Sequence, residues 1–161
     1  MSKDTLFHGR KDYRLDPKGR IPFPSIWYAP LGLGSSGKIV VTRGLSSEEK
    51  YLEIFSIEKW EERMKLIHSF PEGKLRNKII KWYIGAAETV ELDNQNRLRL
   101  SKNLVDYALI NKDVVLMGSI ETVQIWSKEL LDQAESVDDG DFDMVFDFMN
   151  KARKEMAGKS E

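Results

Sequence analysis

The chain contains one short sequence pattern twice, and this repeat constrains the fold more than any other feature. Residues 15–20 read LDPKGR and residues 92–97 read LDNQNR, so each copy has an apolar residue and an aspartate, with arginine four positions after the aspartate. A second match follows downstream, where residues 51–58 (YLEIFSIE) align with residues 123–129 (VQIWSKE). Because both matches occur in the same order along the chain, the sequence indicates an internal duplication.

Composition narrows the class of protein. A chain of 161 residues that is 41% hydrophobic fits one domain, or two small half-domains that share a core. No apolar run approaches the roughly 20 residues that span a bilayer, and residues 1–10 lack the apolar stretch of a signal peptide, so we expect a cytoplasmic protein with no membrane partner. The absence of cysteine excludes disulfides, a thiolate nucleophile and cysteine-ligated zinc.

Charge is unevenly distributed although the net charge is only −1, a value that argues against indiscriminate binding to a polyanion. Residues 10–20 carry five bases and two acids, whereas residues 135–147 carry six acids and no base. Taken alone, each run is more typical of a solvated surface than of a binding site.

The periodicity of apolar residues, together with the turn and cap residues between them, predicts the order of the helices and strands, which is similar in the two halves. In the first half we expect strands at 13–15 and 20–23 around a turn at 16–19, a short helix after Pro24, strands at 38–42 and 51–55, and a helix at 57–68 with Ser56 as its N-cap. A helical connector at 75–83 leads to strands at 89–92 and 97–100, a short helix after Ser101, strands at 114–117 and 123–126, and a helix after Ser127. A terminal amphipathic helix at 142–157 has an apolar stripe that needs a partner.

The repeated turns are the best candidates for a binding site. Residues two apart on a strand share a face, so Lys18 with Arg20, and Arg97 with Arg99, can present charge together. A two-stranded ribbon fits the DNA major groove, and arginine can grip a phosphate or read guanine through two hydrogen bonds. The alternative is that each aspartate and arginine only clasp their own turn as an ion pair, and for a single copy this is the more common role.

Enzymatic interpretations have little support. His8 and His68 are the only histidines, and neither belongs to a metal-ligand spacing. Asp16 and Asp93 are each followed by an arginine that would hold the carboxylate ionised, which does not suit general acid and base catalysis. The chain also lacks a phosphate-binding GxxxxGK[ST] loop, and its four tryptophans fit core packing. We therefore expect no enzyme, no catalytic residue, no metal site, no cofactor and no small-molecule substrate.

The motifs together resemble the MraZ proteins, a family of bacterial transcriptional regulators. The matching stretches are Phe7-His8-Gly9, residues 15–21, Gly85-Ala86-Ala87-Glu88 before the second Asp-x-x-x-Arg, residues 113–118, and Ile125-Trp126-Ser127, so the resemblance covers residues 7–131. It implies an α+β fold in which two homologous β-rich half-barrel repeats, related to AbrB-type swapped-hairpin barrels by a pseudo-two-fold, carry flanking helices. The expected segments are a first repeat at 1–73, a connecting helix at 74–84, a second repeat at 85–134, and an acidic linker with a C-terminal helix at 135–161.

The resemblance also implies a function. MraZ-like proteins form ring-shaped homo-oligomers and bind direct repeats in double-stranded DNA upstream of their own division and cell-wall operon, generally as repressors, which would place this chain at the nucleoid. Lys18, Arg20 and Arg97 are then the residues expected to contact DNA. The full candidate set is Arg14, Lys18, Gly19, Arg20, Gln95, Asn96, Arg97 and Arg99, with Asp16 and Asp93 structuring the turns.

The second motif departs from the family pattern, because Asn96 stands where glycine is usual and Leu100-Ser101 replaces a typical Ile-Pro. The second copy is therefore expected to approach DNA less closely than the first. Two other functions stay open: a structural or protein-interaction module in which both turns are clasps, and an AbrB-like antitoxin that acts through its acidic tail. Two fused barrel halves fit the antitoxin poorly.

Overall fold

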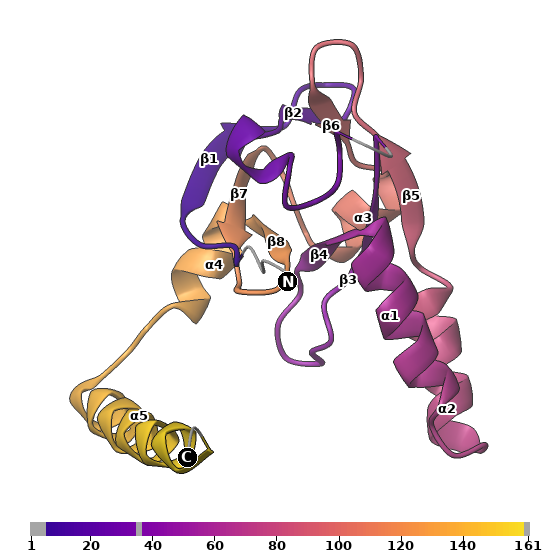
Figure 1. Ribbon diagram of the computed structural model, residues 1–161. Coiled ribbons are helices and arrows are strands. Elements are labelled where there is room, and N and C mark those ends of the chain that lie inside the picture. Colours follow the sequence, from indigo (N-terminus) through magenta and orange to yellow (C-terminus); the bar gives the residue numbers. More distant parts are fainter. Residues whose placement is uncertain (1–5, 35–36, 160–161) are drawn as a thin grey trace. The chain divides into compact units, whose positions relative to one another are not determined.

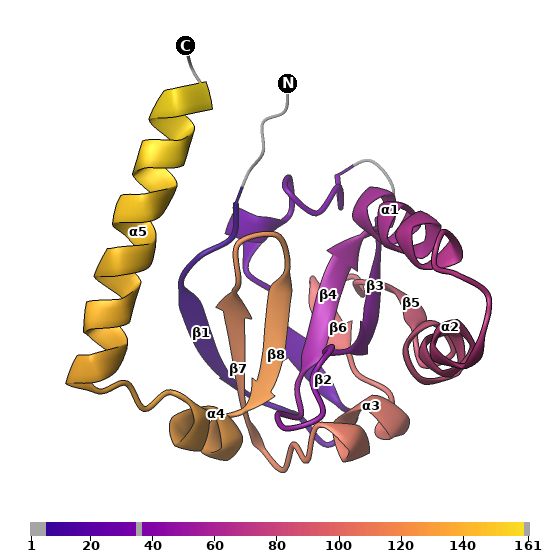
Figure 2. The same cartoon turned by 90° about the horizontal axis from the view of Figure 1, so that it is seen from below.

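The computed structural model describes residues 6–34 and 37–159, which fall into two compact units, one within residues 1–131 and one within 132–161. Residues 1–5 and 160–161, at the ends of the predicted first and last segments, lie outside the described residues. The first unit is α+β, as expected, and is built on a six-stranded antiparallel sheet (Figures 1 and 2). In sheet order its strands are β1 (Arg10–Arg14), β7 (Asp113–Gly118), β8 (Val123–Ser127), β4 (Leu52–Ser56), β3 (Lys38–Arg43) and β5 (Glu88–Glu91), and a separate two-stranded ribbon pairs β2 (Arg20–Pro22) with β6 (Arg97–Arg99).

Strands of the two halves are interleaved in this sheet. β1 pairs with β7 and β5 pairs with β3, while β4 pairs with β8 at the centre. Exchanging β1 with β5, β2 with β6, β3 with β7 and β4 with β8 leaves the whole set of pairings unchanged. Each half supplies strands that pair with strands of the other half, so the pairings do not separate the halves into two units. The repeat boundaries expected from the sequence therefore remain a prediction.

The strands expected at 13–15 and 20–23 form on either side of the turn, but they do not pair with each other. The turn at 16–19 forms, but β1 then pairs with β7 in the register Arg10↔Met117 to Arg14↔Asp113, and β2 pairs with β6. An isolated two-stranded hairpin is marginally stable because it buries little apolar surface. Because β1 and β2 pair with other strands, both can place apolar side chains at a common core. Ile21 of β2 and Tyr13 of β1 contribute to it.

The central strands are apolar on both faces, which explains their continuous β-branched runs. In β3, Ile39 and Val41 face the main core, while Val40 faces a second cluster with Phe55 and Trp60. The main core fills the space between the sheet and the β2–β6 ribbon, and it also contains side chains from the 3-10 turn η1 (Ser25–Trp27) and from α3 (Lys102–Tyr107). This packing fixes the ribbon against the sheet.

Helical segments lie around the sheet, and the two predicted serine caps, at Ser56 and Ser101, are confirmed. The Ser56 hydroxyl accepts a hydrogen bond from the Lys59 backbone N–H (3.1 Å) at the start of α1 (Ile57–His68), and the Ser101 hydroxyl accepts one from the Leu104 N–H (3.3 Å) at the start of α3. The predicted connector is α2 (Lys74–Ile79) continued by a π-helical turn, η2 (Ile80–Ile84), whose Tyr83 is fully buried. α4 (Lys128–Ala134) begins after Ser127 and covers the far part of the sheet near Trp126.

The second unit is dominated by one long helix, α5 (Asp139–Lys159), which begins three residues before the predicted start at 142. Asp138 and Asp141 cap it reciprocally, since each backbone N–H donates to the other carboxylate at 2.9 and 3.1 Å. Every residue from 132 to 159 is exposed, including the large apolar side chains of α5. Within the described part of the chain, no helix is both long enough and apolar enough to cross a membrane.

Candidate nucleic-acid interface

The β2–β6 ribbon has one buried face and one cationic face. In its register Arg20 lies opposite Arg99, Ile21 opposite Leu98, and Pro22 opposite Arg97. Ile21 and Leu98 are fully buried in the main core. Because side chains alternate along a strand, the three arginines lie on the outer face of the ribbon. The ribbon itself is near the top of the view in Figure 1.

The first turn is held by the carboxylate of Asp16. Its Oδ1 accepts hydrogen bonds from the backbone N–H groups of Lys18 (2.9 Å) and Arg20 (2.8 Å), and its Oδ2 accepts one from Arg20 Nε (2.7 Å). The backbone hydrogen bond from Arg20 is the largest cause of the lowered pKa of Asp16, and the Arg20 side chain adds to it against a smaller opposing effect of burial. The carboxylate is therefore ionised whenever the turn is formed at neutral pH.

The second turn repeats this geometry around Asp93. Its Oδ1 accepts from the backbone N–H groups of Gln95 and Arg97, both at 2.9 Å, and its Oδ2 accepts from Arg97 Nε at 2.8 Å. Burial alone would raise the pKa of Asp93, but these hydrogen bonds outweigh it and the pKa is lowered. The two Asp-x-x-x-Arg phrases thus encode the same turn, in which aspartate closes the loop and arginine is oriented by it.

Each turn is also bonded to the opposite strand segment. The Gly19 carbonyl accepts from the Leu100 N–H (2.8 Å), and the Asn96 carbonyl accepts from the Phe23 N–H (3.1 Å). Gly19 has φ +80°, and a Cβ placed on it would lie 2.8 Å from the Leu100 carbonyl oxygen. Asn96 has a smaller positive φ of 58°, in the left-handed region that asparagine tolerates.

The predicted candidates do not all lie together. Arg20, Arg97 and Arg99 share the outer face of the ribbon, and the exposed Lys18, Gln95 and Asn96 lie in the two turns beside it. Arg14 instead belongs to β1 in the main sheet, where its Nε lies 3.6 Å from Asp113 Oδ1. Contact of any of these residues with DNA stays a prediction.

The clasp that the sequence offered as an alternative is present in both turns, and it is compatible with binding. Each clasp uses the Nε atom of its arginine, and within the described part of the chain no further hydrogen bond or ion pair involves the terminal Nη atoms of Arg20 or Arg97. Both side chains retain more than a quarter of their exposure, at 27% and 28%. A guanidinium whose plane is fixed at Nε presents its outer N–H groups in a defined direction, which suits a phosphate or a guanine edge.

The pairing of Arg20 with Arg99 is the feature that sequence reasoning missed. The spacing within each motif predicted same-face pairs along one strand, but the cross-strand register depends on the β2–β6 pairing between halves. The only sequence signal that β2 and β6 pair is that the two motifs occur at equivalent places in the two halves. Among the described residues no group of three or more His, Asp or Glu side chains is placed to hold a metal ion.

Comparison with known proteins identifies the family of this chain. Residues 83–143 match the family model described as "MraZ protein, putative antitoxin-like". The chain is 33% identical over 146 residues to the transcriptional regulator MraZ of Clostridium beijerinckii, an alignment that covers 90% of this chain and 97% of that protein. It is 32% identical to the transcriptional regulator MraZ of Natranaerobius thermophilus (89% and 99% covered) and 35% identical to that of Nitratidesulfovibrio vulgaris (79% and 84% covered). The chain belongs to the MraZ family.

Proposed function

We propose that this chain is a sequence-specific DNA-binding transcriptional regulator that contacts the duplex with the outer face of the β2–β6 ribbon. It acts without catalysis, as a ring-shaped homo-oligomer on direct repeats upstream of its own division and cell-wall operon, and its effect there is repression. Its place in the cell is the cytoplasm, at the nucleoid. The regulator names of the relatives support a role in transcription. The ring, the direct repeats, the repression and the place at the nucleoid are what the resemblance to MraZ proteins implies.

The observation that carries the proposal is the arrangement of three arginines on one narrow antiparallel ribbon. Arg20 and Arg99 lie directly opposite each other while Ile21 and Leu98 hold the other face in the core. Such a ribbon is narrow enough for the major groove, and its position is rigid because both turns are bonded across to the partner strand. A cationic face of this kind on a chain of net charge −1 favours a local contact over indiscriminate binding.

We infer further that the two halves are homologous half-barrel repeats of the AbrB-like, swapped type. The support is the set of strand pairings that is unchanged when the halves are exchanged, together with the two equivalent turns. Several ribbons in a ring would then engage direct repeats in series, so that avidity supplies affinity which a single subunit lacks.

The variant Arg99→Ala gives the cleanest test, because Arg99 is exposed and lies outside both clasps. A lost bidentate contact costs about 1–3 kcal/mol, so binding to the DNA upstream of the gene should weaken by about 5- to 150-fold in a mobility-shift titration. Lys18→Ala should flatten the dependence of log affinity on log salt by about one if Lys18 neutralises a phosphate. Lys65→Ala, an exposed lysine of α1, is the matched control and should change neither quantity.

The structural or protein-interaction module remains the second candidate, because both clasps exist. It predicts that Arg20→Ala lowers thermal stability while Arg99→Ala leaves DNA affinity low and unchanged. Unchanged affinity and salt dependence in a folded Arg99→Ala protein would contradict the proposed DNA-binding face. An antitoxin role predicts instead that the chain binds and neutralises a toxin in the absence of DNA.

A further inference from the structure

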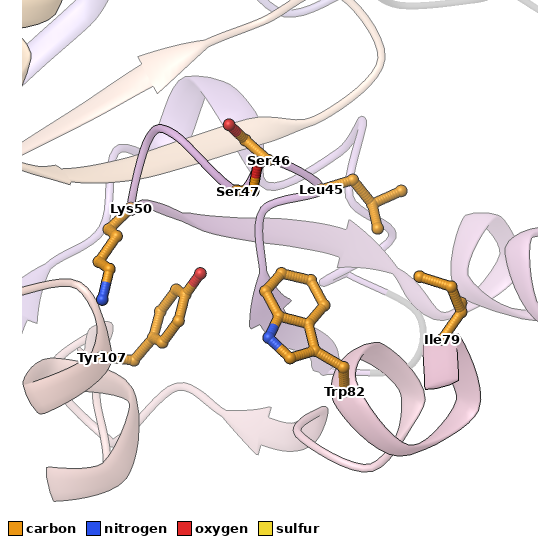
Figure 3. Close-up of a pocket in the computed structure, with 7 residues that line it drawn as sticks. All are labelled: Leu45, Ser46, Ser47, Lys50, Ile79, Trp82 and Tyr107. Atoms are coloured by element: carbon orange, nitrogen blue, oxygen red, sulfur yellow. The ribbon is translucent and has the colours of Figure 1, made fainter. Parts of the chain in front are cut away.

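An open cavity of about 550 Å³ lies on the first unit, away from the arginine ribbon. It is lined by the apolar side chains of Leu45, Ile79, Trp82 and Tyr107 and, on its polar side, by Ser46, Ser47 and Lys50 (Figure 3). In Figure 3 the two aromatic rings stand side by side, with Lys50 reaching toward Tyr107 from one end and Ile79 and Leu45 at the other. The cavity therefore offers an apolar surface with a cation at its edge.

The aromatic surface is reinforced by a second cation. The guanidinium of Arg43 lies 4.7 Å from the ring centre of Tyr107 and 5.3 Å from that of Trp82, and Lys50 Nζ lies 5.4 Å from the Tyr107 ring. These cation–π contacts fix both rings and bring positive charge beside apolar surface. A ligand suited to this cavity carries an apolar group next to negative charge.

The helical segment beside the cavity has the same sign of charge. Residues 74–84, from which Ile79 and Trp82 come, contain four lysines or arginines and no acid. Leu75 of this segment is 68% exposed, and Leu45 at the cavity is 46% exposed. The surface around the cavity is thus basic and apolar, and we call it the α2 surface: Leu45, Lys50 and the exposed residues of 74–84.

α5 carries the complementary pattern. Phe142, Val145, Phe146 and Met149 recur at helical spacing, and their exposures of 38–57% show that they are largely uncovered. Six acids and no base occupy residues 135–147, around the first half of this stripe. In proteins most of a helix's stability comes from the packing of its amphipathic face, and an apolar stripe of this size indicates an interaction surface.

We propose that the first half of α5 from one copy of the chain docks on the α2 surface of a second copy, with a phenylalanine in the cavity beside Lys50. Charge complementarity selects this pairing, because residues 135–147 carry six acids and no base while residues 74–84 carry four bases and no acid. The contact joins two different surfaces, so it is heterologous, and repeating it closes a ring when the rotation allows. The inference rests on the self-association in the proposed function and supplies a contact that produces it.

The test measures the mass of the full chain in solution by sedimentation velocity. The α2-surface variant is Leu45→Asp with Lys50→Glu, and its matched control on α1 is Leu66→Asp with Lys65→Glu, where both residues are also exposed. The helix variant is Phe142→Asp with Phe146→Asp. Its control is Met144→Asp with Phe148→Asp, whose side chains point away from the stripe at about 100° per residue.

The wild type and both controls should assemble beyond two chains, whereas each test variant alone should lose assembly and sediment as a monomer with unchanged circular dichroism. An equimolar mixture of the two test variants should form a species of two chains, because each supplies the surface that the other lacks. If the α2-surface variant assembles like the wild type, if the mixture stays monomeric, or if the wild type is itself monomeric, the proposal is wrong. Loss of assembly in the helix variant alone would indicate pairing of α5 with α5 instead.

DNA binding separates this inference from the proposed function. Both test variants keep the arginine ribbon, so a duplex with a single repeat should bind them as it binds the wild type. Assembly that depends on both surfaces, without any binding to the repeats, would leave the docking contact standing and overturn the DNA-binding proposal. Binding to a single repeat with assembly unchanged in the α2-surface variant would have the opposite meaning.

Discussion

Replacing Gly19 by alanine should damage the ribbon in two separable ways. The backbone at Gly19 has φ +80°, a conformation that side chains rarely adopt. The added Cβ would also lie 2.8 Å from the Leu100 carbonyl oxygen, on the strand segment whose N–H donates to the Gly19 carbonyl. Relief of this contact requires the turn and the Leu100 segment to move apart.

The size of the effect follows from these two parts. The left-handed conformation costs a residue with a side chain about 1–2 kcal/mol, and loss of one backbone hydrogen bond costs about 0.5–1.5 kcal/mol. Gly19→Ala should therefore lower the free energy of unfolding by about 1.5–3.5 kcal/mol. Gly9→Ala is the matched control, because Gly9 has φ +85° but no atom within 4 Å of the added Cβ. It should pay only the conformational cost of about 1–2 kcal/mol.

The free energy of unfolding of both variants can be measured by urea denaturation at one protein concentration, followed by tryptophan fluorescence. Gly19→Ala should also bind promoter DNA more weakly than Gly9→Ala, since the displaced turn carries Lys18 and Arg20. Equal losses of stability in the two variants would refute the close approach at Leu100. A stable Gly19→Ala protein would refute the requirement for glycine altogether.

Three further predictions concern charge. Because the pKa values of Asp16 and Asp93 are lowered, their clasps contribute stability above the ordinary carboxyl pKa and lose it as the pH falls through the folded-state values. A double Asp→Asn variant should therefore lose less free energy of unfolding between pH 7 and pH 3, as measured by urea denaturation. Burial raises the pKa of Glu53, so the contribution of Glu53 to the free energy of unfolding falls as the pH rises from below the ordinary carboxyl pKa. Glu53→Gln should remove this decrease in stability in the same pH series. Arg43→Met should cost about 1 kcal/mol, with a coupling to Tyr107→Leu of similar size in a double-mutant cycle.

The sequence predicted most elements but not how they pair. The Ser56 and Ser101 caps and the helix at 57–68 follow from local rules of capping and periodicity, and they are confirmed. The partners of the strands expected at 13–15 and 20–23 could not be predicted, because pairing depends on where apolar strands find a common core, and the partner of β1 is β7 in the other half of the chain. Local sequence has no information about so distant a contact.

The candidate site shows the same division. Aspartate and arginine at four-residue spacing predicted the clasps, which form at 2.7 and 2.8 Å. The opposition of Arg20 and Arg99 could not be predicted, since it is set by the register between the halves. Trp82 packs against the second core cluster, as expected, but its contact with Arg43 at an open cavity could not be predicted from the residue pattern.

The pairing of β1 with β7 also governs the order of events during synthesis. β1, which contains Arg10, has no neighbour in the sheet until β7, which contains Met117, has been synthesised. β3 and β4 pair with each other, but their other edges are paired only after β5 and β8 have been synthesised. A ribosome that has made only the first half of the chain therefore carries unpaired strand edges and half of an apolar core. Such edges attract other strands, so the growing chain depends on rapid completion or on chaperones until β8 has emerged. A chain truncated at its C-terminal side before Ser127, the last residue of β8, should accordingly aggregate and form no stable smaller domain.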